Sequence, residues 1–102
     1  MKAKVVKFQI KTGKRDEVIR LFEEFVVPGA MKQKGFTGGM LLTEPNTENA
    51  TSIALWETEA EIRASEANGY YAGWVAKMSD LLSRLPSREI YEVSNLFNIP
   101  IQ

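Results

Sequence analysis

The sequence predicts an α+β fold whose elements follow in the order β-α-β-β-α-β. Four short apolar segments, at about 5–10, 36–43, 51–56 and 88–97, have the length of strands, and the first and last alternate in polarity. The segments after the first and third strands instead carry apolar residues three and four positions apart, the period of an amphipathic helix. This order is typical of a ferredoxin-like fold, a four-stranded antiparallel sheet with its helices on one face.

The first strand and the first helix are separated by Thr12-Gly13. In the strand, Val6, Phe8 and Ile10 share one face. The apolar stripe of the helix has the spacing i, i+3, i+4, i+7 and consists of Val18, Leu21, Phe22 and Phe25. Pro28 either ends this helix or begins a short second helical turn.

Residues 36–56 are predicted to form a hairpin whose strands are joined by a polar, turn-rich loop at 44–49. Directly after it, Thr58 and Glu61 have the spacing of a capping box, in which each side chain accepts from the other residue's amide. A short helix is expected to start there and to end at Asn68-Gly69.

A second helix follows and has the clearest apolar stripe in the chain. Its members are Tyr71, Trp74, Val75, Met78, Leu81, Leu82 and Leu85. Pro86 is predicted to end this helix, because proline lacks the amide hydrogen that a helix interior needs. The last strand is then expected at about 88–97, with Asn95 inside it.

Length and composition exclude several classes of protein. The 102 residues are predicted to form one domain, 1–102, of ordinary soluble composition, with no apolar run that could span a bilayer and no secretion signal. The chain has no histidine, which argues against metal and haem ligation. Its net charge is zero, which argues against general nucleic-acid binding. It has no cysteine, which excludes disulfides and thiolate chemistry. We expect a cytoplasmic protein with no metal, no cofactor and no nucleic-acid or membrane partner.

Positive charge is concentrated near the start of the chain. The basic residues of the first twenty positions are Lys2, Lys4, Lys7, Lys11, Lys14, Arg15 and Arg20. One interpretation is a solvated strand and helix start. The other is a positive rim that steers an anionic substrate.

Helices on one face leave the other face of the sheet bare. This face could be formed by apolar residues such as Leu41, Ile53, Leu55, Tyr91 and Val93, or by the residues that alternate with them along the strands. An uncovered apolar sheet face implies a partner. We therefore predict a homodimer in which two sheets pack face to face.

The chain resembles the antibiotic biosynthesis monooxygenase family of dimeric α+β barrels. The likeness is carried by residues 6–14 (VKFQIKTGK), 34–42 (KGFTGGMLL) and 54–60 (ALWETEA). It implies a small pocket between sheet and helices. Similar proteins oxidise quinols, anthrones or polyphenols with O₂ and without metal or flavin, because an ionised, electron-rich aromatic can reduce O₂ directly. Such chemistry needs a dry apolar slot with a few hydrogen-bond donors.

One branch of this superfamily degrades haem with a histidine ligand, an asparagine and a catalytic tryptophan. This chain lacks that pattern: Val6 stands at the asparagine position, Ser65 at the tryptophan position and Val75 near the histidine position. Trp56 matches a different tryptophan, at a strand end. The resemblance therefore does not extend to haem degradation.

Candidate substrate-binding residues are aromatic, methionine or amide side chains. They are Phe8, Phe22, Met40, Trp56, Tyr70, Tyr71, Trp74, Met78 and Asn95. For Trp56, Tyr71 and Trp74 ordinary core packing competes with a pocket role. Tyr70 is off the apolar stripe, and its hydroxyl is expected to face water, the alternative being donation to a substrate oxygen. Asn95 could anchor a substrate or simply lie at a sheet edge.

The sequence leaves the catalytic residues unassigned and several functions open. The leading hypothesis is a cofactor-independent monooxygenase for a small aromatic. The alternatives are a non-catalytic small-molecule-binding or stress-response dimer, and an isomerase or carbonyl-processing member of the same fold. The last would need an inward-facing ionisable group with a shifted pKa. Arg63 and Arg88 could bind an anion, but surface ion pairing is the favoured interpretation.

Overall fold

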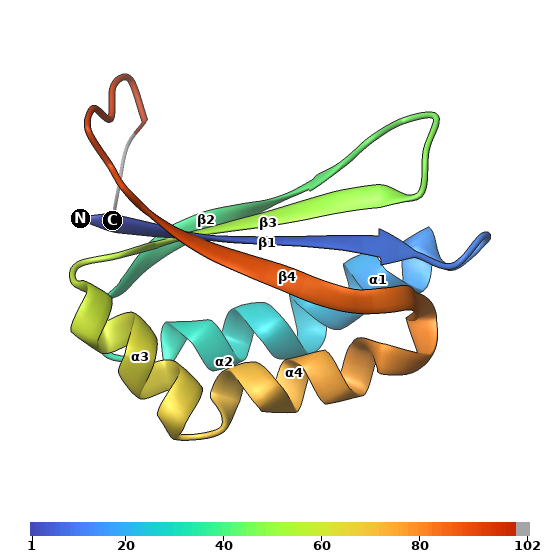
Figure 1. The fold of residues 1–102 in the computed structure, drawn as a ribbon, viewed down its shortest axis with the longest axis horizontal. Coiled ribbons are helices and arrows are strands. Elements are labelled where there is room, and N and C mark those ends of the chain that lie inside the picture. Colours follow the sequence, from blue (N-terminus) through green and yellow to red (C-terminus); the bar gives the residue numbers. More distant parts are fainter. Residues whose placement is uncertain (100–102) are drawn as a thin grey trace.

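The computed structural model describes residues 1–99 and contains a four-stranded antiparallel sheet with its helices packed against one face (Figure 1). The strands are β1 (Lys2–Ile10), β2 (Phe36–Thr43), β3 (Asn49–Trp56) and β4 (Leu82–Glu92), in the spatial order β2-β3-β1-β4. β1 is therefore a central strand, bonded to β3 on one side and to β4 on the other. This arrangement confirms the predicted ferredoxin-like α+β fold.

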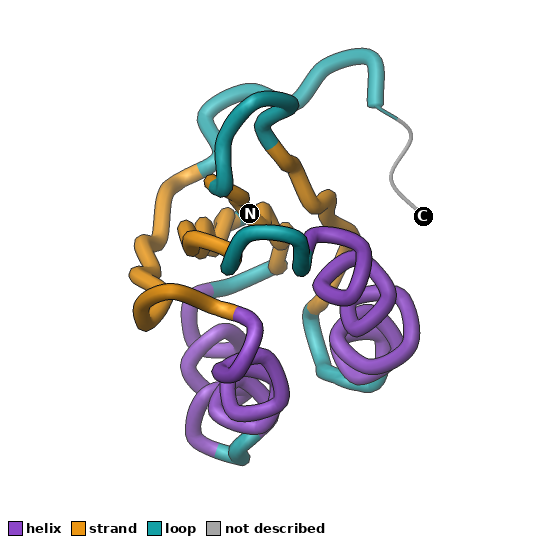
Figure 2. Tube along the Cα trace, turned by 90° about the vertical axis from the view of Figure 1, so that its right-hand side faces the viewer, coloured by secondary structure: helices purple, strands orange, loops and turns teal. Residues whose placement is uncertain are grey.

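The helices form two groups on the same side of the sheet (Figure 2). The first group is continuous and consists of α1 (Arg15–Leu21), a π-helical turn η1 (Phe22–Val26) and α2 (Val27–Met31). The second consists of α3 (Glu59–Ala67), α4 (Tyr70–Met78) and a 3₁₀ turn η2 (Ser79–Leu81). Gly69, with a φ of +89°, separates α3 from α4 as the Asn68-Gly69 pattern predicts.

Pro28 begins a second helical segment, which decides between the two alternatives left by the sequence. It lies in the first turn of α2, directly after the π-helical turn η1. Proline has no amide hydrogen and its ring crowds the carbonyl four residues earlier. The wider π turn makes room for that ring without ending the helix.

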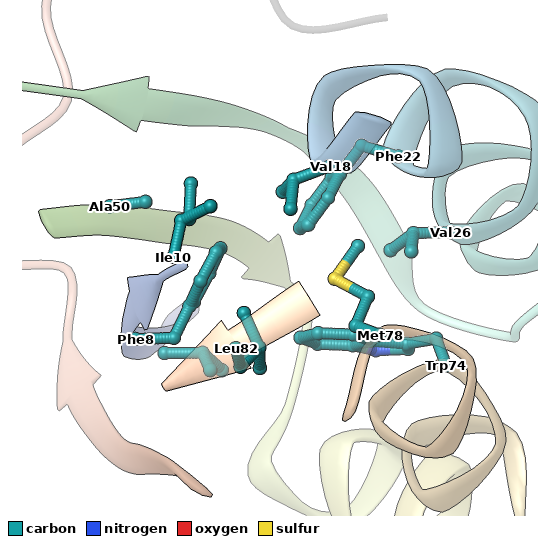
Figure 3. Packing of buried hydrophobic residues seen from close by; sticks show 10 residues of the cluster. Phe8, Ile10, Val18, Phe22, Val26, Ala50, Trp74, Met78 and Leu82 are labelled. Atoms are coloured by element: carbon teal, nitrogen blue, oxygen red, sulfur yellow. The ribbon is translucent and has the colours of Figure 1, made fainter. Parts of the chain in front are cut away.

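The core lies between the sheet and the helices, where Phe8 and Ile10 of β1 meet side chains from α1, η1 and α4 (Figure 3). Phe22, in the first helical group, contacts both the sheet and the second group, because its ring centroid is 6.2 Å from that of Phe8 and 5.5 Å from that of Trp74. Met78 is fully buried in the same cluster. Offset and edge-to-face aromatic contacts of this kind stabilise a core beyond the area that they bury.

The capping box of α3 forms only in part. The Glu61 amide donates to the Thr58 hydroxyl oxygen over 3.2 Å, as expected of an N-cap. The Glu61 carboxylate accepts from the Thr58 hydroxyl over 3.0 Å instead of from the Thr58 amide. Its carboxylate also lies against Gly35, where a Cβ would come within 2.2 Å of it. Gly35 therefore lets this turn pack closely against the start of α3.

The C-terminal elements differ from the prediction. The last helix ends at Met78, and Leu82, which was assigned to its stripe, instead begins β4. Pro86 does not end a helix but lies within this strand, where Leu85 and Pro86 together oppose the single residue Phe8. An edge strand with a bulge tolerates proline, because no neighbour needs its missing amide hydrogen. β4 ends at Glu92, so the strand predicted at 88–97 was placed too late.

The sheet face away from the helices carries Val5, Ile53, Leu55 and Tyr91, which are neighbours across the strands. Leu41 was a candidate for this face, but it pairs with Ser52 and packs against the core on the helical side. The strand alternation fixes this assignment, because Ser52 lies on the helix-facing side of β3. Within residues 1–99, no helix is long and apolar enough to cross a membrane.

Candidate functional site

A cavity of about 600 Å³ lies between the sheet and the helices. Its walls come from β1, β2 and β3 on one side and from α1, η1, α2 and α4 on the other. The volume falls in the range of small-molecule pockets, which is roughly 300 to 1,000 Å³. The fold therefore provides the pocket that the family resemblance implies.

The cavity wall is mostly apolar. Val6 of β1, Phe22 and Val26 of η1 and Trp74 of α4 contribute to its inner part, and all four are buried. The most exposed large apolar side chain of the wall is Met31 of α2. Val27 of α2 and Gly39 of β2, which also line the cavity, are exposed as well. The cavity therefore opens to solvent between α2 and β2.

Glycines shape the β2 wall of the cavity. The pairing of β2 with β3 is irregular between Phe36 and Gly38, and this bulge lies where β2 lines the cavity. At Gly39 a Cβ would come within 2.6 Å of the Ile53 carbonyl oxygen, so only glycine allows β3 to approach this closely. Bulges on edge strands bend the strand and re-aim its side chains. The Gly38-Gly39 pair of the sequence is the signal for this feature.

The structure brings five of the nine candidate residues into the cavity wall. These are Phe22, Met40, Trp56, Tyr70 and Trp74. Phe8 and Met78 are buried in the adjoining core, and Tyr71 packs at its edge; none of these three is part of the wall. Asn95 lies beyond the end of β4 and is exposed, so it is not the strand residue that the sequence predicts.

Tyr70 is placed by a hydrogen bond within the protein and not by water. Its hydroxyl donates to the Val26 carbonyl oxygen over 2.6 Å, and its ring lies against Gly29, where a Cβ would come within 2.7 Å. The expectation that this hydroxyl faces water was wrong, because the ring spans from α4 to η1 and α2. Burial raises the pKa of Tyr70 to about 12, so the hydroxyl remains a proton donor at neutral pH.

Trp56 contributes an unpaired hydrogen-bond donor near the cavity. The residue is 2% exposed and its ring packs edge-on against Phe36 with centroids 5.5 Å apart. Within the described residues 1–99 its indole Nε1–H has no hydrogen-bond partner. A buried donor without a partner costs about 1–3 kcal/mol. Since Trp56 also lines the cavity, an acceptor on a ligand is one way to remove this cost.

Lys4 is a cavity residue that sequence reasoning missed. It was grouped with the surface lysines, but its side chain is on the helix-facing side of β1, 5% exposed, in the cavity wall. Its Nζ lies 3.4 Å from the centroid of the Tyr71 ring. The signal in the sequence was the alternation of β1: Lys4 precedes Val6 by two positions and so shares its face.

Lys4 belongs to a charged cluster with Glu66 and Arg88. The Lys4 Nζ forms an ion pair with Glu66 Oε2 at 2.9 Å. Arg88 donates a hydrogen bond to the other carboxylate oxygen, Glu66 Oε1, over 2.6 Å. Burial lowers the pKa of Lys4, against the opposing effect of Glu66. For Glu66, burial acts to raise the pKa, but Arg88 and Lys4 together outweigh it and the pKa is lowered.

The remaining charged groups offer little chemistry at the cavity. Glu23 is its one lining carboxylate among residues 1–99, and this side chain is exposed. In the same part of the chain no three acidic, histidine or cysteine side chains gather as metal ligands. Arg63 pairs with Glu59 on the surface, as the sequence suggested. The cavity can therefore bind a flat apolar molecule, and the polar residues of its wall include Lys4, Ser52 and Trp56.

A family model described as antibiotic biosynthesis monooxygenase matches residues 1–77. The chain belongs to this family. The match runs from β1 into α4 and includes every residue that lines the cavity. It confirms the resemblance seen in the sequence. A comparison with curated proteins by sequence gives no match.

Solved structures share the fold of this antibiotic biosynthesis monooxygenase family member at low sequence identity. A monooxygenase from the gene ActVA-Orf6 of Streptomyces coelicolor, in complex with the ligand nanaomycin D, has a TM-score of 0.81 and 18% identity, covering 97% of this chain and 91% of that chain. SnoaB, a cofactor-independent oxygenase from Streptomyces nogalater, has a TM-score of 0.79 and 17% identity, covering 96% and 97%.

A third solved structure also shares this fold. A protein of unknown function from Nitrosomonas europaea has a TM-score of 0.77 and 23% identity, covering 97% of this chain and 93% of that chain. At such identities the comparisons establish the shared fold. One fold can carry several activities, so function has to be argued from the cavity.

Proposed function

We propose that this protein is a cofactor-independent monooxygenase that oxidises a small quinol-, anthrone- or polyphenol-like aromatic with O₂. The observation that carries the proposal is the largely apolar cavity of about 600 Å³ in a member of the antibiotic biosynthesis monooxygenase family. Flat aromatic walls from Trp56, Trp74 and Phe22 suit a planar ligand. Two structural neighbours are themselves a monooxygenase and a cofactor-independent oxygenase, which supports the class.

The proposed reaction balances without an external reductant. In an anthrone, the methylene loses two hydrogens and gains one oxygen atom from O₂, while the second oxygen atom leaves as water with those two hydrogens. The carbon loses four electrons and O₂ accepts four. The ionised substrate is the reductant, so the protein has only to bind it, favour its anion and exclude bulk water.

The test is O₂ consumption by the metal-stripped protein with hydroquinones, naphthohydroquinones and anthrones. We expect uptake above autoxidation, with one atom of labelled O₂ in the anthraquinone product. Ala54→Leu fills the cavity from β3 and should abolish turnover, whereas Ala72→Leu, on the exposed face of α4, should not. Binding of these aromatics without any O₂ uptake would contradict the proposal and favour the non-catalytic binding alternative.

A carbonyl-processing or isomerase role is a second candidate, and Lys4 is the observation that favours it. A buried amine with a lowered pKa is the kind of group that forms a Schiff base with an aldehyde or ketone. Borohydride trapping with small aldehydes distinguishes the two roles. A covalent adduct at Lys4 would support carbonyl chemistry, and its absence would remove this candidate.

A further inference from the structure

The charge of the Lys4–Glu66–Arg88 cluster is not balanced. Glu66 is shared, with one carboxylate oxygen 2.9 Å from Lys4 and the other 2.6 Å from Arg88. Two cations and one carboxylate leave a net charge of +1. A partly buried site with excess positive charge favours a ligand that carries the missing negative charge.

Lys4 is the member of this cluster that reaches the cavity. Of the three residues it alone lines the cavity wall; Glu66 of α3 and Arg88 of β4 do not. An ammonium group has three N–H donors. Glu66 and the Tyr71 ring occupy two sides of the group. This leaves donor capacity for a ligand oxygen in the cavity.

We propose that the Lys4 ammonium binds the ionised oxygen of the substrate, so that the protein takes acidic phenols and enols in their anionic form. This inference rests on the proposed function and specifies its substrate class. The substrate O–H bond breaks, its electron pair stays on the oxygen, and the proton passes to solvent at the mouth between α2 and β2. The resulting anion is the electron-rich form that O₂ oxidises.

Two opposing effects act on the charge of Lys4: burial lowers its pKa, while its contacts with Glu66 and the Tyr71 ring favour the ammonium that this role needs. The Glu66 carboxylate and the face of the Tyr71 ring both stabilise an ammonium. Arg88 opposes it but is itself bonded to Glu66. Two further ionisable groups line the cavity: Tyr70 of α4 keeps its proton at neutral pH because burial raises its pKa, and Glu23 of η1 is exposed. A neutral amine would lose both favourable contacts.

A pair of matched probes tests the inference. 2-Hydroxy-1,4-naphthoquinone is ionised at neutral pH, and its methyl ether has nearly the same shape but no charge. Both should quench the fluorescence of Trp56 and Trp74 in the cavity wall. We expect the anion to bind the wild-type protein about tenfold more tightly, the effect of one charged hydrogen bond. Lys4→Met should remove this preference and leave affinity for the ether unchanged.

Two further variants test whether the effect depends on the overall charge of the protein or on the charge of the cluster. Lys7→Met removes an exposed lysine from the opposite face of β1 and should retain the preference. Glu66→Gln raises the cluster charge and should strengthen binding of the anion. A measurement on the wild-type protein needs no variant at all: the bound dye should keep its anionic visible spectrum to lower pH than the free dye.

The outcomes separate the two proposals. Equal binding of both probes by the wild-type protein, or a preference that survives in Lys4→Met, would overturn the role of Lys4 and leave an aromatic-binding cavity. A dye that protonates in the cavity at the same pH as in solution would overturn it too. If neither probe binds, the cavity is not an aromatic site, and the proposed function fails with the inference.

Discussion

At the scale of single residues, Tyr70 connects three helical segments. Its hydroxyl donates to the Val26 carbonyl oxygen, at the end of the π turn, and its ring occupies the space left by Gly29. A π turn is a widened helix whose backbone groups are poorly satisfied. Tyr70 therefore stabilises the turn that presents Phe22 and Val26 to the cavity.

We predict that Tyr70→Phe lowers the free energy of unfolding by about 0.5–1.5 kcal/mol at neutral pH, since it leaves the Val26 carbonyl without this donor. Between about pH 10 and about pH 12 the unfolded tyrosine is ionised while folded Tyr70 keeps its proton. The folded state then binds more protons, so wild-type stability falls as pH rises through this window. Urea unfolding of the wild type and Tyr70→Phe measures this. The difference between their free energies of unfolding should be smaller above pH 10 than at pH 8. A constant difference would contradict this account.

Individual polar residues were the least predictable part of the site. Lys4 looks like its surface neighbours Lys2 and Lys7, because composition says nothing of burial; only the alternation of β1 separates it from them. Its partners Glu66 and Arg88 are 22 residues apart in sequence, a contact that no local pattern reveals. The prediction for Asn95 was wrong because the last strand, expected to include it, ends earlier, at Glu92. The aromatic residues were easier, since large apolar side chains gather wherever the core and cavity meet.

At the scale of secondary-structure elements, β2 depends on two adjacent glycines that meet different surroundings. A Cβ at Gly39 would lie 2.6 Å from the Ile53 carbonyl oxygen, which is backbone and cannot rotate away. A Cβ at Gly38 would meet nothing within 4 Å. The pair therefore offers a matched test of how closely β2 and β3 must approach.

We predict that Gly39→Ala destabilises the protein by about 1–3 kcal/mol, the usual cost of forcing a group into a filled space. Gly38→Ala should stay within about 0.5 kcal/mol of the wild type. Chemical denaturation of the three proteins measures this directly. Because β2 is a wall of the cavity, Gly39→Ala should also weaken the binding of the naphthoquinone probes. Equal stabilities of the two variants would show that the strand bends freely at this point.

Elements up to Met78 were predictable because the spacing of apolar residues in each of them fits either a strand or a helix, but not both. The predicted boundary between the last helix and the last strand was wrong, because there the apolar spacing fits both structures. Met78, Leu82 and Leu85 continue the helical spacing, yet the chain turns through η2 and enters β4 at Leu82. Apolar leucines suit a buried helix and a buried strand end alike, and Pro86 is tolerated at a bulge opposite Phe8. Pairing with β1, a contact distant in sequence, decides the outcome.

At the scale of the whole molecule, the sheet has one covered face and one bare face (Figures 1 and 2). The bare face carries apolar side chains on all four strands, and several are largely exposed in a single chain: Met40 47%, Leu42 47% and Tyr91 48%. Beyond β4, Phe97 is 73% exposed. Exposed apolar side chains gathered on one sheet face are typical of an interface. It supports the homodimer predicted from the sequence.

We predict that the protein sediments at twice its chain mass of 11.5 kDa and that Leu55→Glu converts it to the monomer. Leu55 lies opposite Ala3 on the bare face, so a carboxylate there would be buried without a partner in a sheet-to-sheet interface. Ala72→Glu, on an exposed face of α4, should leave the mass unchanged. A wild-type monomer at micromolar concentration would contradict the prediction.

Probe binding by the Leu55→Glu monomer then shows whether the site is complete in one chain. Ala54 and Trp56 line the cavity on one side of β3, while Leu55 between them points to the other. The cavity lies on the helix-facing side of the sheet, and its mouth is between α2 and β2, away from the bare face. We therefore expect the monomer to retain the affinity of the dimer for both naphthoquinones. A loss of binding on dissociation would mean that the partner sheet holds β2 and β3 in the shape that the cavity requires.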